Sequence, residues 1–172
     1  ATCHAISSAL LLKTSSISHS RSMVNDLSPS ALNEHGKKEY EKGTYLSAAK
    51  LFSQAAQAYD SANDPLNAAE MRNNESVAWL QGGKAKEALQ ATEGTEKIFE
   101  NAGDLKRQGI AISNRAAALE GLKKWQEALA DYDRAASIFE KAGEGDMHSM
   151  VRKASANIHL KFGRVESSQM DV

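Results

Sequence analysis

The chain has 172 residues with a formal net charge of −1, and 41% of its residues are apolar but only 6% aromatic. That length suits one domain with a tail, and the balanced charge gives no basic field for nucleic acid or anionic lipid. The single cysteine, Cys3, excludes an intramolecular disulfide and a thiolate metal cage. We therefore expect no nucleic-acid partner, and no apolar run approaches the roughly 20 residues of a transmembrane helix.

Residues 1–28 are expected to lie outside the fold, as a disordered N-terminal extension. Residues 1–25 contain seven serines and no acidic residue, a composition similar to that of a transit peptide. Two readings stay open: residues 1–22 are a transit peptide for a plastid or mitochondrion, or Met23 is the true start. The default expectation is an intracellular, cytoplasmic protein.

The rest of the chain is expected to form seven helices, because the whole chain contains 28 alanines and only two prolines. Ser28 and Asp64 are expected N-caps, each followed by a proline at the first helical position. Gly43 is expected to end the first helix. In chain order, the helices are expected at 29–42, 45–62, 65–81, 85–102, 105–121, 125–142 and 147–162.

The sequence repeats itself every 40 residues. The segment at 58–64 recurs at 98–104 and again at 138–144, each time with a large apolar residue, an acidic or polar turn and a small residue at matching places. A constant period of this size is typical of a solenoid, in which each unit buries its apolar face only against its neighbours.

The first unit carries a specific signature: Gly43, Tyr45, Ala48, Phe52 and Ala55. This spacing resembles the tetratricopeptide repeat, in a longer-helix variant of about 40 residues per repeat. The second unit departs from the pattern at Thr92 and Thr95. The resemblance implies a right-handed α–α superhelix over 29–163, with repeats at 29–64, 65–104 and 105–144, a closing helix at 147–162 and a flexible tail at 164–172.

The resemblance also implies where a partner binds, because in this family the first helix of each repeat lines a concave groove. The corresponding positions here are Asn33, Lys37, Tyr40, Asn73, Asn74, Val77, Asn114, Lys153 and Asn157. Asn74 and Asn114 are one period apart, and an amide can pair with both polar groups of a peptide main chain. The alternative is that these asparagines are ordinary solvated surface.

A better-known activity of the family is a clamp for the acidic tail of a chaperone. At the five clamp positions this chain has Asn33, Lys37, Asn74, Ile110 and Asn114, and only Asn74 matches the pattern. Without the cationic donors, binding two carboxylates costs desolvation with little opposite charge in return. The chaperone-clamp function is therefore disfavoured.

No enzyme motif accompanies the repeats. Phosphate-binding loops, the His-Glu-x-x-His motif and nucleophile elbows are absent, so we expect no catalytic residue, cofactor or metal. His148 and His159 are eleven residues apart, roughly 16 Å along a helix, too far to share a metal. His35 is expected at a packing position of the first helix.

The sequence thus predicts a non-enzymatic adaptor that binds a peptide or helix of another protein in the groove. The alternative is a structural subunit held in a larger complex by its convex or terminal faces. The last helix has an apolar stripe, formed by Met147, Val151, Ala154 and Ile158, that is expected to close the last repeat. Leu160 and Phe162 fall off this stripe, and no helix follows to cover their side. That side suggests a further hypothesis, a homodimer through the last helix.

Overall fold

The computed structural model describes residues 27–170, with side chains described for 27–161. Within this range the chain is entirely helical apart from turns, which confirms the all-α prediction. The helices are α2 (Pro29–Glu41), α3 (Tyr45–Ser61), α4 (Pro65–Gln81), α5 (Ala85–Ala91), α6 (Thr95–Asn101), α7 (Leu105–Gly121), α8 (Trp125–Ala142) and α9 (Gly145–Met170). Helices α5 and α6 together take the place of one predicted helix. Counted as one interrupted helix, they bring the described chain to seven helices that pack in sequential pairs.

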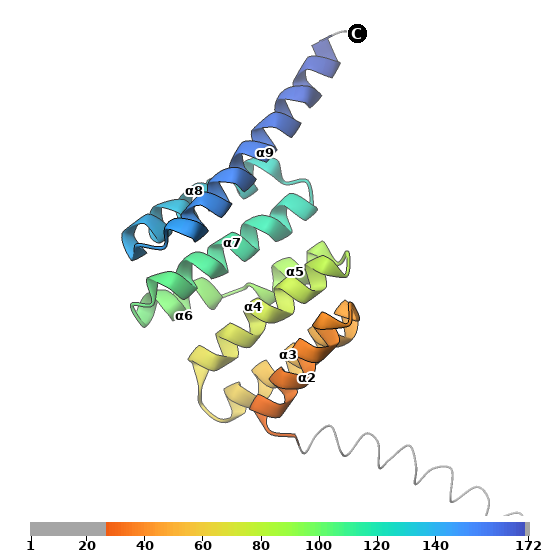
Figure 1. The fold of residues 1–172 in the computed structure, drawn as a ribbon, viewed down its shortest axis with the longest axis vertical. Helices are drawn as coiled ribbons and strands as arrows, with labels where there is room; N and C mark the ends of the chain where they lie inside the picture. The colour runs from red at the N-terminus through yellow and green to blue at the C-terminus, as the bar shows by residue number, and fades with distance from the viewer. Residues whose placement is uncertain (1–26, 171–172) are drawn as a thin grey trace, which may run out of the picture.

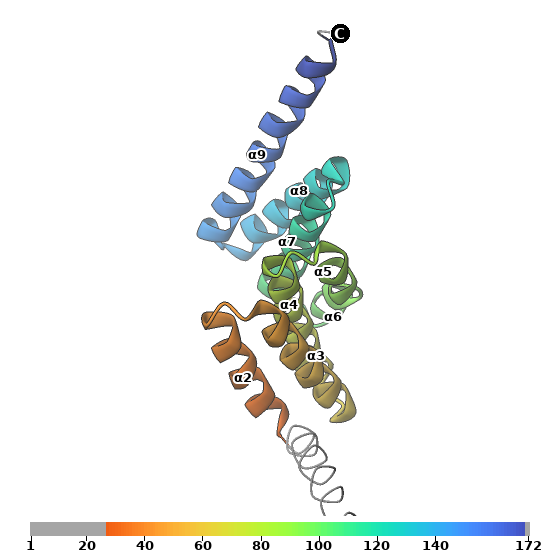
Figure 2. The same cartoon turned by 90° about the vertical axis from the view of Figure 1, so that its right-hand side faces the viewer.

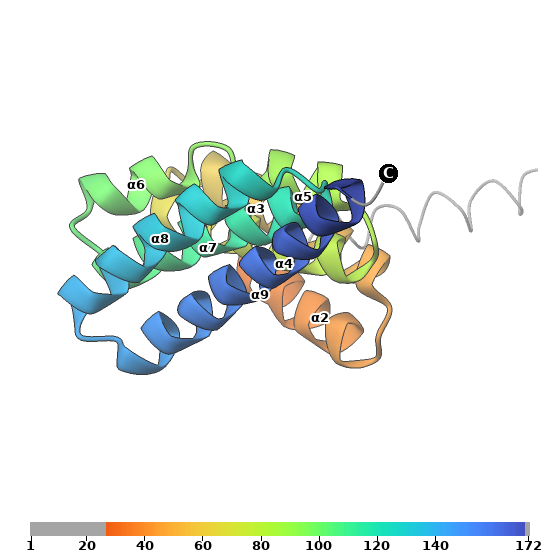
Figure 3. The same ribbon diagram turned by 90° about the horizontal axis from the view of Figure 1, so that it is seen from above.

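Consecutive helices pack against each other along the chain (Figure 1), except for α5 and α6, which each pack on α4 and α7 instead. The first helices of the pairs, α2, α4 and α7, lie with α9 in one layer, and α3, α5, α6 and α8 form the other (Figures 2 and 3). Helices α4 and α7 also contact each other directly. In Figure 2, α2 and α9 stand out on the same side of the molecule, and we call that side the concave face.

The predicted helix starts are present. Ser28 Oγ accepts a hydrogen bond from the Ala31 N–H at 3.2 Å, and Asp64 Oδ1 accepts one from the Asn67 N–H at 3.1 Å. Asp104 caps α7 in the same way, through the Arg107 N–H at 2.9 Å. These side chains satisfy donors that the first turn of a helix leaves without a partner.

Three clusters of buried side chains form the core. The N-terminal core lies among α2, α3 and α4 around Phe52, and the C-terminal core lies among α7, α8 and α9 around Tyr132 and Ile158. Between them is a small central core, built on Ala69, Phe99 and Ala111. Alanines make up much of all three clusters, as close packing between helices requires.

The large aromatic side chains are buried unequally. Phe52 and Tyr132 are buried, whereas Trp79 and Trp125 are only half-buried. Both indoles pack on the edge of a core, Trp79 on the N-terminal one and Trp125 on the C-terminal one. The two indoles therefore fill the gaps between helices only in part.

The prediction of one continuous helix at 85–102 is wrong. The helix breaks at residues 92–94, where Gly94 adopts the left-handed conformation with φ of +74°. The Thr92 hydroxyl donates to the Leu89 carbonyl at 2.7 Å, and the Thr95 hydroxyl donates to the Thr92 carbonyl at 2.8 Å. Threonine side chains that bond to nearby backbone groups compete with helix continuation, and glycine accepts the left-handed turn.

A group of ion pairs ties α6 to the next repeat despite the break. Asp131 accepts two hydrogen bonds from Arg115, each 2.7 Å long, and a third from Arg134. Glu96 of α6 pairs with both arginines. This group connects α6, α7 and α8 through side chains.

Three further expectations need correction or lie outside the description. Helix α9 runs to Met170, so the predicted flexible tail at 164–172 is helical as far as the description goes; residues 163–170 contain no proline to stop it. His35 is exposed, because Leu32 and Gly36 are the residues of α2 that face the core. The expectations for the N-terminal extension fall almost wholly on residues 1–26, which are not described.

In the described part of the chain, no helix is long and apolar enough to cross a membrane.

Candidate functional site

The concave face carries a hollow between α2 and α4, which we call the α2–α4 hollow. Its volume is about 270 Å³, and it is lined by Lys37, Tyr40, Glu41, Phe52, Asn74 and Val77. Gly36 lets the backbone of α2 come close to the floor, since a Cβ there would lie 2.7 Å from the Phe52 ring. Four of the residues predicted for the groove, from two different repeats, thus surround one space: Lys37, Tyr40, Asn74 and Val77.

A second hollow, the α7–α9 hollow, lies near the other end of the same layer. It has a volume of about 310 Å³ and is lined by Glu120, Ala154, Asn157, Leu160 and Lys161. The Lys161 ammonium donates to Glu120 at 2.8 Å and also lies 5.9 Å from the centre of the Trp125 ring. The Tyr132 hydroxyl donates to the other oxygen of Glu120 at 3.2 Å, so three helices meet at this carboxylate.

Asn157 is the predicted groove residue that lines the α7–α9 hollow. Lys153 is exposed and lies one turn before Asn157 on the same side of α9. Asn114 is half-buried on α7, between the two hollows in chain order, and lines neither of them as described above.

The expectation that Asn33 and Asn73 lie on the open surface of the groove is wrong. Asn73 is only 5% exposed and Asn33 is half-buried, because both lie at the edge of the packed side of their helices. The Oδ1 atom of each is buried and has no hydrogen-bond partner among the described residues. Both oxygens therefore belong to the packed interior and not to an open groove surface.

The charges of the concave face are mostly paired within it. Lys37 donates to Glu34 at 2.8 Å, which lowers the pKa of Glu34 and raises the pKa of Lys37, in each case chiefly through that hydrogen bond. The Lys37 ammonium is therefore already paired, and a ligand carboxylate would have to compete with Glu34 for it. Among the described side chains, Glu41 on α2 and Lys153 on α9 form no ion pair in this structure.

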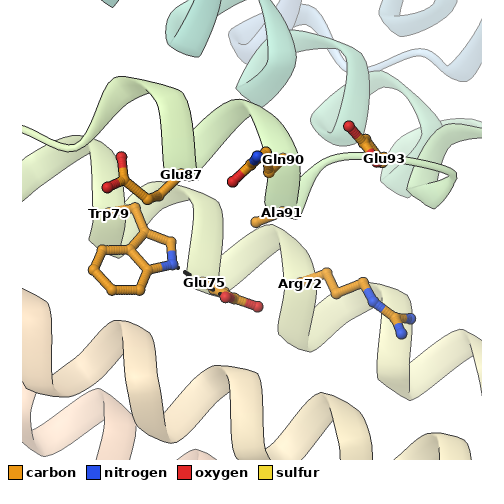
Figure 4. Close-up of a pocket in the computed structure, with 7 residues that line it drawn as sticks. All are labelled: Arg72, Glu75, Trp79, Glu87, Gln90, Ala91 and Glu93. Atoms are coloured by element: carbon orange, nitrogen blue, oxygen red, sulfur yellow. Dashed lines mark hydrogen bonds between the residues drawn. The ribbon is translucent and has the colours of Figure 1, made fainter.

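A hollow of about 510 Å³, the α4–α5 hollow, lies away from the predicted groove residues. Arg72, Glu75 and Trp79 of α4 line it together with Glu87, Gln90 and Ala91 of α5 and Glu93 of the break (Figure 4). The Trp79 Nε1–H donates to Glu75 at 3.1 Å, and Arg72 pairs with Asp60 of α3. This hollow is acidic and polar, and no sequence motif points to it.

In the part of the chain that the structure describes, no group of three or more His, Cys, Asp or Glu residues could hold a metal ion. The sequence also missed two contributors to the hollows. From the sequence, Phe52 is expected only as a core residue. Glu120 becomes part of a hollow only because α9 lies beside the end of α7.

Comparisons with known proteins provide no relative for this chain. No protein-family model matches the sequence, and a search of curated proteins finds no match either.

Proposed function

We propose that this protein is a non-enzymatic adaptor that binds a segment of another protein on its concave face. The observation that carries the proposal is the α2–α4 hollow, where an apolar floor, an amide and charged side chains from two successive repeats surround one space. Such a mixture of apolar lining and a few polar groups is typical of recognition sites. The 40-residue period and the pairwise packing support a further proposal, that the chain is a tetratricopeptide-repeat protein with a right-handed superhelix.

Asn74 and Asn114 provide the test. We expect partners captured by the full chain and identified by mass spectrometry to bind the double variant Asn74→Ala, Asn114→Ala at least tenfold more weakly, since each lost hydrogen bond costs about 1 kcal/mol. The matched control is the double variant Gln57→Ala, Gln126→Ala, which removes two exposed amides from the second helices α3 and α8. If the partner binds the asparagine double variant as tightly as the original, the groove proposal is wrong.

The alternative, a structural subunit that docks through its convex face, has its own observation in the α4–α5 hollow. Gln90 and Glu93 are exposed there. In that case the change Gln90→Arg with Glu93→Arg abolishes capture of the partner, and the asparagine double variant has no effect.

For the compartment, we propose the cytoplasm, with a plastid or mitochondrion as the alternative if residues 1–22 act as a transit peptide. The proposal rests on sequence composition alone. Sequencing the N-terminus of the native protein distinguishes the two, because a mature end close after residue 22 together with organelle fractionation contradicts the cytoplasmic proposal.

A further inference from the structure

We propose that the partner segment is extended and carries two bulky apolar side chains at a fixed spacing of at least about six residues, one for each hollow of the concave face. This inference rests on the proposed function and specifies the chemistry of the partner. It follows from the lining of the hollows, their separation and the charges beside them.

The α2–α4 hollow suits one bulky apolar side chain. Tyr40, Phe52 and Val77 provide most of its apolar lining, and its volume is about 270 Å³. Since an apolar cavity of about 150 Å³ holds benzene, the hollow has room for a leucine or phenylalanine side chain. Asn74 borders the same space and can pair with the main chain of the residue that inserts there.

The α7–α9 hollow can receive a second apolar side chain. Leu160 lines it and is 66% exposed, although it is a large apolar residue. Ala154 and the carbon chain of Lys161 extend the apolar surface, because the Lys161 ammonium is turned to Glu120. A leucine placed here would cover Leu160 and leave the ion pair in place.

The distance between the hollows selects the conformation of the segment. Two interhelix steps at the 8–10 Å spacing of packed helices span roughly 16–20 Å. The hollows are farther apart than this, because neither α2 and α4 nor α7 and α9, the pairs that flank the hollows, are among the closely packed helix pairs. An extended chain therefore needs at least about six residues, at about 3.3 Å per residue. A helix needs more than roughly 11–13 residues, and it leaves no main-chain groups for Asn74 and Asn114 to bind.

The charges at the two ends give the segment a polarity. Glu41 borders the α2–α4 hollow, and Lys153 lies one turn before Asn157 of the α7–α9 hollow. A basic residue beside the first apolar anchor and an acidic residue beside the second therefore complement the concave face.

The experiment pans a phage-displayed library of random peptides on the full 172-residue chain, followed by synthesis of the enriched peptides. We expect enriched peptides to share two bulky apolar positions at one fixed spacing of at least about six residues. Replacing either position by serine, or changing the protein by Val77→Asp or Leu160→Asp, should weaken binding about tenfold. The control Leu46→Asp, at an exposed leucine of α3, should leave binding unchanged.

The outcomes separate this inference from the proposed function. Peptides that lose binding in the asparagine double variant, but have one anchor or no fixed spacing, overturn the two-anchor inference and leave the adaptor proposal standing. Enriched peptides that depend on no concave residue, or a library that enriches none, overturn both. Circular dichroism checks that each variant folds; if Val77→Asp does not, Val77→Phe, which fills the hollow with an apolar ring, takes its place and should also weaken binding.

Discussion

Single positions without a side chain control how closely the helices approach. At Gly109 in α7, an added Cβ would lie 2.5 Å from the ring of Phe139, which is 1% exposed and has no room to move. We expect Gly109→Ala to lower the free energy of unfolding by roughly 1–2 kcal/mol, because overpacking of about 1–3 kcal/mol exceeds the gain in helix propensity. Urea denaturation measures the change.

Gly145→Ala is the matched control for that substitution. Gly145 is also helical, but nothing lies within 4 Å of a Cβ added there. We expect it to be neutral or slightly stabilising. Equal stability changes in the two variants would show that the contact with Phe139 does not limit the packing.

The cap of α7 depends on pH. The backbone N–H of Arg107, followed by the Arg107 guanidinium, lowers the pKa of Asp104. A folded-state pKa below the unfolded value of about 3.9 stabilises the protein above about pH 4, and this contribution disappears as the pH falls through the folded pKa. We expect Asp104→Ala to cost about 1 kcal/mol at neutral pH and less in acid. In urea titrations at several pH values, Asp104→Asn should retain most of the cap, with a weaker dependence on pH.

For single residues, the sequence predicts helix caps correctly, because a cap depends only on residues next to it in the chain. It does not predict correctly which residues at the edge of a helix face are buried. The caps at Ser28 and Asp64 follow from a side chain and the first turn beside it, so they could be identified from sequence. The exposure of His35 and the burial of Asn73 depend on how each helix is rotated about its axis. A neighbouring position differs by about 100° around the helix, and only the packed neighbours fix that rotation.

Among the helices, the interrupted pair α5 and α6 differs most from the others. Each has seven residues, whereas α3, α4, α7 and α8 each have 17 or 18. Short helices contain few interior amides that are protected on both sides. We expect amide hydrogen exchange, followed by mass spectrometry, to be fastest at residues 89–97 within the solenoid and slowest in α3 and α8. Protection at 89–97 equal to that of α8 would contradict this.

The break itself shows the limit of sequence analysis at the level of elements. The departure at Thr92 and Thr95 is visible in the sequence, and helix propensity alone still favours one helix there. Both hydroxyls bond to backbone carbonyls of the last turn of α5 and the break, which becomes evident only once the backbone is placed. The α7–α9 hollow could not be foreseen for a similar reason, since Glu120 and Lys161 are 41 residues apart.

For the molecule as a whole, the central core is the weakest connection. Phe99 is fully buried in it, between the larger N-terminal and C-terminal cores. We expect Phe99→Ala to cost roughly 3–5 kcal/mol and to make the two ends unfold separately. Trp79 and Trp125 lie on different cores. Fluorescence of the single-tryptophan variant Trp79→Phe therefore reports the unfolding of the C-terminal core, and that of Trp125→Phe reports the unfolding of the N-terminal core. Coincident urea transitions in the Phe99→Ala background would contradict independent unfolding.

The homodimer hypothesis also belongs to the whole molecule. Met150 is 69% exposed and Leu160 66% exposed on α9. Pairing through this helix predicts a sedimentation coefficient that rises with concentration, and the change Met150→Asp should remove the rise. A constant sedimentation coefficient at high concentration excludes the dimer.

The separate N-terminal core has a consequence for biosynthesis. Helices α2, α3 and α4 enclose the Phe52 core without any residue from later in the chain. This part can therefore fold while the ribosome is still adding α7, at roughly 5–20 residues per second. Phe99, in contrast, is buried against Ala111 of α7. The middle of the nascent chain thus keeps a phenylalanine exposed until α7 emerges.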